Sequence, residues 1–133
     1  MENKLTLSHL KLHKALSALR AMVEKPMQED RSNVDACIQR FECSGELFWK
    51  YLRRLIESKG GIVTYPKEVL RDAYQGKLID NDTLWLEMLQ DKNQTSHTYD
   101  EELADKIYKN IVEKYYPLMQ GSFEELTKDQ KTL

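Results

Sequence analysis

The sequence predicts an all-α protein, an up-and-down four-helix bundle with one additional short helix. Apolar residues recur at spacings of three and four along most of the chain, which is the period of a helix with one buried face. Only 5 Gly and 3 Pro interrupt 133 residues, and 32% of the residues are charged, as expected of helices with solvated outer faces. The one strand-like run is the linker Ile62-Val63-Thr64, and the sequence has no internal repeat.

The first two predicted helices carry the clearest apolar stripes. The first stripe consists of Leu5, Leu12, Leu16, Leu19 and Val23, and Pro26 ends that helix. Ser32 and Asp35 resemble a capping box that opens a second helix. The apolar stripe of this second helix consists of Val34, Ile38, Phe41, Phe48, Leu52 and Leu55, and the helix is predicted to end at Gly60-Gly61. A helix over residues 32–59 is roughly 42 Å long, so we expect it to act as the spine of the bundle.

The third and fourth predicted helices are shorter. Pro66 suits the first position of a helix, and Gly76 is suited to end it about three turns later. Asp80 and Thr83 are candidate caps for a fourth helix, which carries Leu84, Trp85, Met88 and Leu89 on one side. This helix gives way to Asn93-Gln94-Thr95-Ser96, residue types that favour caps and turns.

A fifth helix is predicted after a second capping-box pattern, formed by Thr98 and Glu101. Pro117 is expected to kink or end it. The residues from 121 to 133 are polar and are expected to fray. We therefore predict a single helical-bundle domain over residues 1–120 and a polar C-terminal tail over residues 121–133, because a chain of this size can bury a core without disulfides or a structural metal.

Composition and charge exclude several functional classes. The net charge of −2 and the pI of about 5.9 give no global reason for avid binding to DNA, RNA or an anionic membrane. Residues 1–23 lack the pattern of a signal peptide, and no stretch approaches the roughly 20 apolar residues of a membrane span. Cys37 and Cys43 would project from different helix faces, so we expect reduced thiols and a cytoplasmic protein.

One segment concentrates chemically active side chains. Residues 91–100 place a lysine, amides, hydroxyls, a histidine and a tyrosine at a junction between two helices. The free amides at a helix start can receive an anion, and His97 is the group there that titrates near neutral pH. From the residues alone, the simpler interpretation is that Asn93, Thr98 and Asp100 cap helices and His97 is a hydrogen-bonded surface residue.

The order of the motifs resembles the nucleotidyltransferase substrate-binding proteins, helical partners of minimal nucleotidyltransferases within the HEPN superfamily. The similarity runs from about Ile38 to Tyr116. It rests on Arg40-Phe41-Glu42, Glu46-Leu47, Trp49-Lys50, Pro66-Lys67-Glu68-Val69 with Arg71, Gly76-Lys77-Leu78-Ile79-Asp80, Leu84-Trp85-Leu86, Asn93, and Thr95-Ser96-His97-Thr98-Tyr99-Asp100. Several separate blocks in order make the resemblance specific.

The resemblance implies an up-and-down bundle that forms a homodimer, places its junction motif at the dimer cleft and binds a separately encoded minimal nucleotidyltransferase. Nucleotide and RNA are the candidate ligands. Members of the wider superfamily often cleave RNA without metal through an Arg, a spacer of about four to six residues and a His, frequently followed two residues later by Tyr. In toxin–antitoxin pairs the nucleotidyltransferase silences such a toxin, in some cases by adenylylating that Tyr.

Carried over to this chain, the resemblance makes His97 the general acid or base and Tyr99 the candidate acceptor of a nucleotide. Asn93 and Ser96 would hold phosphate or orient His97. Glu42 and Glu46 would be supporting acids from the long helix. This sequence departs from the superfamily's Arg, spacer and His pattern at the first position, where it has Lys92 in place of Arg. Because lysine lacks the planar bidentate fork of arginine, stabilisation of a pentacoordinate phosphate would be poorer.

Other patterns favour structural interpretations. His9 and His13 have the i, i+4 spacing of a metal pair, but neither an intervening Glu nor a third ligand accompanies them. The cations Lys50, Arg53 and Arg54 suit a helix C-terminus as well as a phosphate. Most of the aromatic residues at helical spacing are assigned to packing; they are Trp49, Trp85, Tyr51, Tyr108, Tyr115 and Tyr116. No phosphate-binding loop or metal site is predicted, and no cofactor.

Three hypotheses follow. The first is an interaction protein, a homodimer that binds a nucleotidyltransferase and offers substrate or Tyr99 to it. The second is a weak metal-independent ribonuclease, in which His97 and Lys92 of two subunits flank the scissile phosphate. In the third, His97 and Tyr99 only hold the dimer together.

Overall fold

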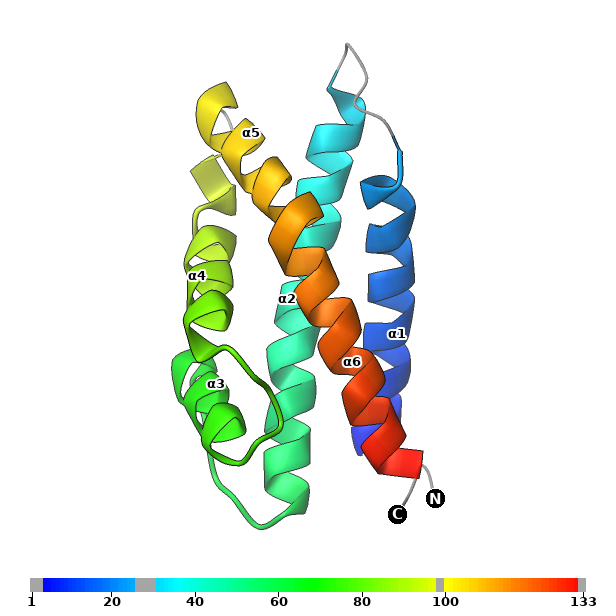
Figure 1. The fold of residues 1–133 in the computed structure, drawn as a ribbon, viewed down its shortest axis with the longest axis vertical. Coiled ribbons are helices and arrows are strands. Elements are labelled where there is room, and N and C mark those ends of the chain that lie inside the picture. Colours follow the sequence, from blue (N-terminus) through cyan, green and yellow to red (C-terminus); the bar gives the residue numbers. More distant parts are fainter. Residues whose placement is uncertain (1–3, 26–30, 98–99, 132–133) are drawn as a thin grey trace.

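The computed structural model describes residues 4–25, 31–97 and 100–131. Their elements are α1 (Lys4–Val23), α2 (Ser32–Ser58), α3 (Pro66–Gln75), α4 (Asp82–Asn93), a 3₁₀ turn η1 (Thr95–His97), α5 (Glu101–Asn110), a π-helix η2 (Ile111–Tyr115) and α6 (Tyr116–Lys131). These residues include no strand. The predicted fold class, an up-and-down helical bundle with one additional short helix, α3, is confirmed (Figure 1).

Helix α2 is the spine of the bundle, as expected. It contacts α1, α3, α4, α5 and η2. In Figure 1, α1 lies on one side of α2, α3 and α4 lie on the other, and the continuous segment from α5 to α6 crosses in front. The largest fully buried side chains are Trp85, Tyr51, Tyr115, Phe41 and Phe48. The assignment of Trp85, Tyr51 and Tyr115 to packing is confirmed. Trp85 of α4 lies against Phe48 of α2 with ring centroids 4.8 Å apart.

Three predicted helix starts are wrong in detail. Helix α2 is preceded by Arg31 at φ 61°, so Ser32 is the first helical residue instead of the cap. Helix α4 is capped by Asn81, also left-handed at φ 55°, whose side chain accepts a hydrogen bond from the Leu84 amide, instead of by Asp80 or Thr83. Helix α5 is capped by Asp100, which accepts from the amides that follow it. Thr98 lies outside the described residues. The predicted start at Pro66 and end at Gly76 are confirmed for α3.

The C-terminal helix also differs from the prediction. Pro117 does not end it, because α5 continues through η2 into α6. Inside an α-helix, proline removes one backbone donor and crowds the carbonyl four residues earlier. The π-helix lies directly before Pro117 and has wider turns with different backbone hydrogen bonds at that carbonyl, so the helix continues past the proline. The frayed stretch expected from residue 121 is instead helical to Lys131, and Phe123 and Leu126 are 5% and 3% exposed. The described helices include none long and apolar enough to cross a bilayer.

Candidate functional site

The candidate site lies where α4 ends and η1 begins. Lys92 and Asn93 are the last residues of α4, and Ser96 and His97 belong to η1. The buried Thr95 Oγ1 donates to the Lys92 carbonyl at 2.7 Å, and the His97 amide donates to the Gln94 carbonyl at 3.0 Å. These bonds fold the chain tightly after α4. As a result, Asn93, Ser96 and His97 are all exposed at one corner of the bundle.

Lys92 turns back from this corner onto the spine. Its Nζ lies 3.0 Å from Glu46 Oε2, and its side chain is only 18% exposed. The aliphatic stem crosses Gly45, where an added Cβ would lie 3.0 Å from Lys92 Cδ. Gly45 therefore provides the space that lets the lysine reach its partner.

Glu46 is the centre of a small polar cluster. Trp49 Nε1 donates to its Oε2 at 3.0 Å, and Lys50 Nζ lies 3.4 Å from its Oε1. Partial burial works to raise the pKa of the Glu46 carboxyl, but the hydrogen bonds from Trp49 and Lys92 and the two lysine charges outweigh it. The pKa of Glu46 is therefore held below its ordinary value of 4.5. The Glu46 carboxylate is therefore ionised at neutral pH, where it pairs with the Lys92 ammonium.

The Glu46→Gln variant removes the ion pair with Lys92 and should lose only about 1 kcal/mol of unfolding free energy at pH 7, because this pair is partly exposed to solvent. Since folding lowers the pKa of Glu46, its stabilisation is present above the ordinary value of 4.5 and is lost as the pH falls through the lower folded value. Urea unfolding between pH 3 and pH 7 should therefore show the two proteins converging in acid. Glu42→Gln is the matched control, and a Glu46→Gln deficit that persists undiminished at pH 3 would contradict this account.

A second network fixes the end of α4 to the π-helix. Tyr115 is fully buried, and its hydroxyl donates to Asp91 Oδ2 at 2.5 Å. Asn110 Nδ2 donates to the same oxygen at 3.0 Å. Burial, followed by the hydrogen bond to Asp91, raises the pKa of Tyr115 far above its ordinary value, so the phenol keeps its proton. Asp91, the residue directly before Lys92, is thus bonded to the last residue of α5 and to the π-helix that follows it.

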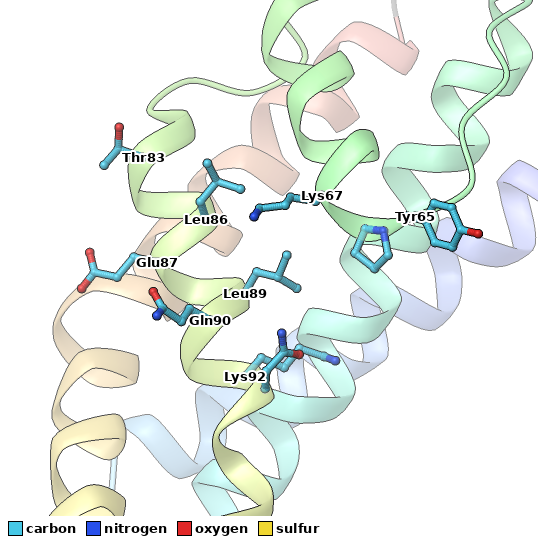
Figure 2. Close-up of a pocket in the computed structure, with 10 residues that line it drawn as sticks. Tyr65, Lys67, Thr83, Leu86, Glu87, Leu89, Gln90 and Lys92 are labelled. Carbon is cyan, nitrogen blue, oxygen red and sulfur yellow. The ribbon is translucent and has the colours of Figure 1, made fainter.

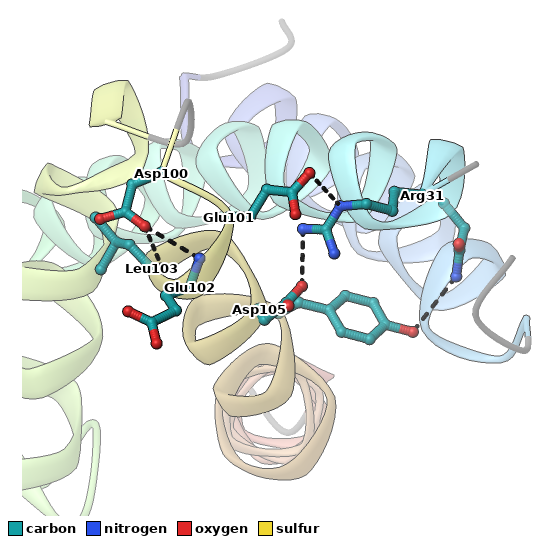
Figure 3. A network of polar contacts seen from close by, with 8 residues as sticks. Arg31, Asp100, Glu101, Glu102, Leu103 and Asp105 are labelled. Atoms are coloured by element: carbon teal, nitrogen blue, oxygen red, sulfur yellow. Dashed lines mark hydrogen bonds and ion pairs between the residues drawn. The ribbon is translucent and has the colours of Figure 1, made fainter. Parts of the chain in front are cut away.

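The start of α5, on the other side of the junction, is fixed to the start of α2. Arg31 Nη2 lies 2.8 Å from Asp105 Oδ1, and Arg31 Nε lies 3.9 Å from Glu101 Oε1 (Figure 3). Asp100 Oδ1 accepts from the amides of Glu102 and Leu103. The N-terminus of α5 is therefore satisfied by its own cap, and the predicted capping role of Asp100 is confirmed.

A groove runs beside the junction between the start of α3 and the outer face of α4. It has a volume of about 840 Å³. Its lining residues are Tyr65, Pro66, Lys67, Thr83, Leu86, Glu87, Leu89, Gln90, Lys92 and Asn93. In Figure 2, Lys67 extends from α3 toward Leu86 and Leu89 of α4, and Lys92 lies at the end of the groove nearest the junction. Two predicted site residues, Lys92 and Asn93, therefore share one concave surface.

The predicted site residues divide into three groups. Lys92 and Glu46 are in direct contact, and Asn93 borders the same groove as Lys92. Ser96 and His97 lie on the exposed turn next to them. Glu42 is half-buried in α2, one turn before Glu46. Its side chain makes no hydrogen bond or ion pair with another residue that the structure describes. Tyr99 lies outside the described residues.

The structure adds contacts at three residues to which the sequence analysis gave no role in the site, namely Gly45, Asp91 and Tyr115. Gly45 carried one signal, since a glycine inside a long helix often marks a close approach. The hydrogen bonds of Asp91 with Asn110 and Tyr115 could not be predicted from the sequence, because they join segments whose relative placement depends on the whole bundle.

The residues of the other patterns make contacts within the bundle. His9 stacks against Phe123 at 4.8 Å, and its Nε2 lies 3.1 Å from Thr127 Oγ1. Among the residues described, no cluster of three metal-ligating side chains occurs. The three cations near the end of α2 pair with neighbouring acids; they are Lys50 with Glu46, and Arg53 and Arg54 with Glu57. Cys37 and Cys43 are free thiols, as expected.

Comparison with known proteins decides the family. Residues 7–128 match the model of the family described as nucleotidyltransferase substrate binding protein like. The chain belongs to this family. The match covers the long helices, the groove and the junction, and it confirms the resemblance seen in the sequence motifs.

Two proteins with similar sequences can be compared with this member of the family. A protein of Haemophilus influenzae described as probable ribonuclease HepT is 34% identical over 83 residues, which are 59% of this chain and 57% of the relative. The aligned part thus spans little more than half of that relative's length. A crystal structure of a Thermus thermophilus protein has a TM-score of 0.77 and 36% identity, and the alignment covers 86% of this chain and 98% of that one.

Proposed function

We propose that the chain is the helical, substrate-binding subunit of a nucleotidyltransferase complex. In this proposal two copies of the chain form a homodimer, and the homodimer binds a separately encoded minimal nucleotidyltransferase. The observation that carries the proposal is the family match over residues 7–128. The groove beside the junction and the exposed turn after α4 offer surfaces for such a role.

The arrangement of Lys92 favours a binding role over cleavage of RNA by this chain alone. A cation that stabilises a pentacoordinate phosphate must be free to approach it. The Lys92 ammonium is instead held 3.0 Å from Glu46, and its side chain is mostly covered. Using it on a phosphate would require breaking that pair and leaving Glu46 with fewer partners. Asn93, Ser96 and His97 are exposed, so a visiting subunit can reach them.

Co-expression with the nucleotidyltransferase encoded beside this chain tests the proposal. A tag on this chain should retain the untagged nucleotidyltransferase through size exclusion at micromolar concentration. Light scattering of the chain alone should give twice its 15.7 kDa mass. Elution of the two proteins as separate species would overturn the proposed partnership, and a monomeric mass would overturn the homodimer.

The second candidate is a weak metal-independent ribonuclease, with His97 as general acid or base and Lys92 near the scissile phosphate. The similarity to the probable ribonuclease HepT favours it. Purified dimer should then cleave RNA in the presence of a metal chelator, and His97→Ala should lower the rate by at least about a hundredfold. An unchanged rate in the variant would exclude this function.

We also propose that the two proteins form a cytoplasmic toxin–antitoxin-like pair in which Tyr99 accepts a nucleotide. Expression of this chain alone should slow growth, and co-expression of the nucleotidyltransferase should restore it. Intact mass spectrometry should show the addition of one nucleoside monophosphate to wild type and none to Tyr99→Phe. Equal masses for the wild-type protein before and after incubation with nucleotidyltransferase and nucleotide would count against modification.

A further inference from the structure

We propose that the outer face of α1 is a docking surface for an acidic amphipathic helix of another protein. The α1 face consists of five exposed residues, Lys4, Leu7, Leu10, Lys11 and Lys14. Their spacings of three and four residues place them on one side of the helix. In Figure 1, α1 and α4 lie on opposite sides of α2, so a protein bound at the α1 face leaves the junction after α4 free. This contact is therefore additional to the proposed contacts of the nucleotidyltransferase.

The α1 face has an apolar centre that the bundle does not cover. Helix α1 packs against α2 and α6, and its buried Leu12, Leu16 and Leu19 lie on the side opposite the α1 face. Leu7 and Leu10 lie one turn apart and are 45% and 47% exposed. Interfaces between proteins combine an apolar centre with a polar rim. The two leucines therefore favour a partner that presents apolar side chains.

The rim of the α1 face is strongly basic, although the whole chain has a net charge of −2. Helix α1 contains Lys4, Lys11, Lys14 and Arg20 and no acidic residue. Arg20 pairs with Glu24 at 2.8 Å. The three lysines form no ion pair with another residue in the described part of the chain. Three uncompensated ammonium groups around two leucines match a partner with acidic side chains beside an apolar stripe.

A hollow at the start of α1 extends this basic surface. It has a volume of about 400 Å³ and is lined by Lys4, Leu5, Arg54, Glu57 and Ser58. Glu57 already pairs with two arginines, since its carboxylate oxygens lie 3.7 Å from Arg53 Nε and 3.1 Å from Arg54 Nη1. A carboxylate of the partner that enters the hollow would therefore meet an excess of positive charge.

The composition of the α1 face disfavours two other occupants. In a twofold contact between two copies of the chain, the same patch lies on both partners. The lysines of one copy would then lie close to those of the other, and like charges repel. RNA is disfavoured because a phosphate backbone binds cations and polar groups, which would leave Leu7 and Leu10 exposed to water.

Fluorescence anisotropy with a labelled amphipathic peptide of leucine, alanine and glutamate tests the assignment. The peptide has about 20 residues, which is long enough to form a helix. It should bind the purified chain in the micromolar range, and more weakly as salt is added. A peptide with the same residues in scrambled order should bind at least about tenfold more weakly, because its leucines and glutamates no longer lie on separate sides of a helix.

Charge reversal locates the contact on α1. Lys11→Glu/Lys14→Glu should raise the Kd of the peptide at least about tenfold, because it reverses the charge of the rim. Lys106→Glu/Lys109→Glu makes the same change of charge at exposed positions of α5 and should bind like wild type. All four residues are exposed, so urea unfolding should show nearly wild-type stability for both variants.

Replacing both leucines tests the apolar centre separately. Leu7→Ser/Leu10→Ser should weaken peptide binding about tenfold and leave its salt dependence unchanged. The assignment would be overturned if the peptide did not bind, if both peptides bound equally, or if the α1 and α5 variants had equal effects. A greater loss of affinity for an oligouridylate than for the peptide in Lys11→Glu/Lys14→Glu would identify a nucleic-acid surface instead and would also overturn it.

Discussion

Replacing Trp85 with alanine should lower the free energy of unfolding by about 3–5 kcal/mol, the cost typical of removing a large aromatic side chain from a packed core. Trp85 is fully buried and joins α4 to Phe48 of α2. Without it, the helix that carries Lys92 and Asn93 loses its main apolar anchor. Urea unfolding followed by far-ultraviolet circular dichroism measures the loss.

Thr83→Ala is the matched control for Trp85→Ala, because Thr83 is exposed on the same helix. Its effect should stay within about 0.5 kcal/mol. A Trp85→Ala protein as stable as the Thr83→Ala protein would contradict the packing described for α4.

Replacing Asp91 with alanine should cost about 2–4 kcal/mol, since it removes a carboxylate that accepts two hydrogen bonds, one of them from a buried phenol. Tyr115 is fully buried, so its hydroxyl cannot turn to bulk water. The Asn110 amide loses the same acceptor. Equilibrium urea unfolding at pH 7 measures the difference from wild type.

Two milder variants distinguish loss of the network from general damage to α4. Asp91→Asn keeps an acceptor for Tyr115 and should cost about half as much as the alanine variant. Tyr115→Phe removes the donor and leaves the half-buried Asp91 with access to water, and should cost about 1 kcal/mol. If Asp91→Ala proved no more destabilising than Tyr115→Phe, the network would not hold α4 as described.

The fold could be predicted because each long helix repeats its signal many times. The stripe in α2 extends over several turns, so a single misplaced residue does not alter the conclusion. Helix ends depend instead on one or two residues. Arg31 and Asn81, both in the left-handed region, occupy the capping positions instead of Ser32 and of Asp80 or Thr83, and the π-helix before Pro117 could not be predicted from a proline alone.

The contacts of the predicted site residues could be predicted only in part. Lys92 and Glu46 were both singled out, yet nothing in their spacing indicated that they pair across two helices. The groove depends on how α3 lies beside α4, which is a property of the assembled bundle. The homodimer and the role of Tyr99 remain predictions, because they involve a second subunit and a residue outside the described part of the chain.

We propose that this chain works by binding a nucleotidyltransferase. Calorimetric titration of the purified chain with the nucleotidyltransferase encoded beside it tests this role most directly. We predict a saturable heat with a dissociation constant in the micromolar range or below, and a stoichiometry set by the dimer. No detectable heat at several temperatures, together with RNA cleavage by the chain alone that depends on His97, would contradict the claim.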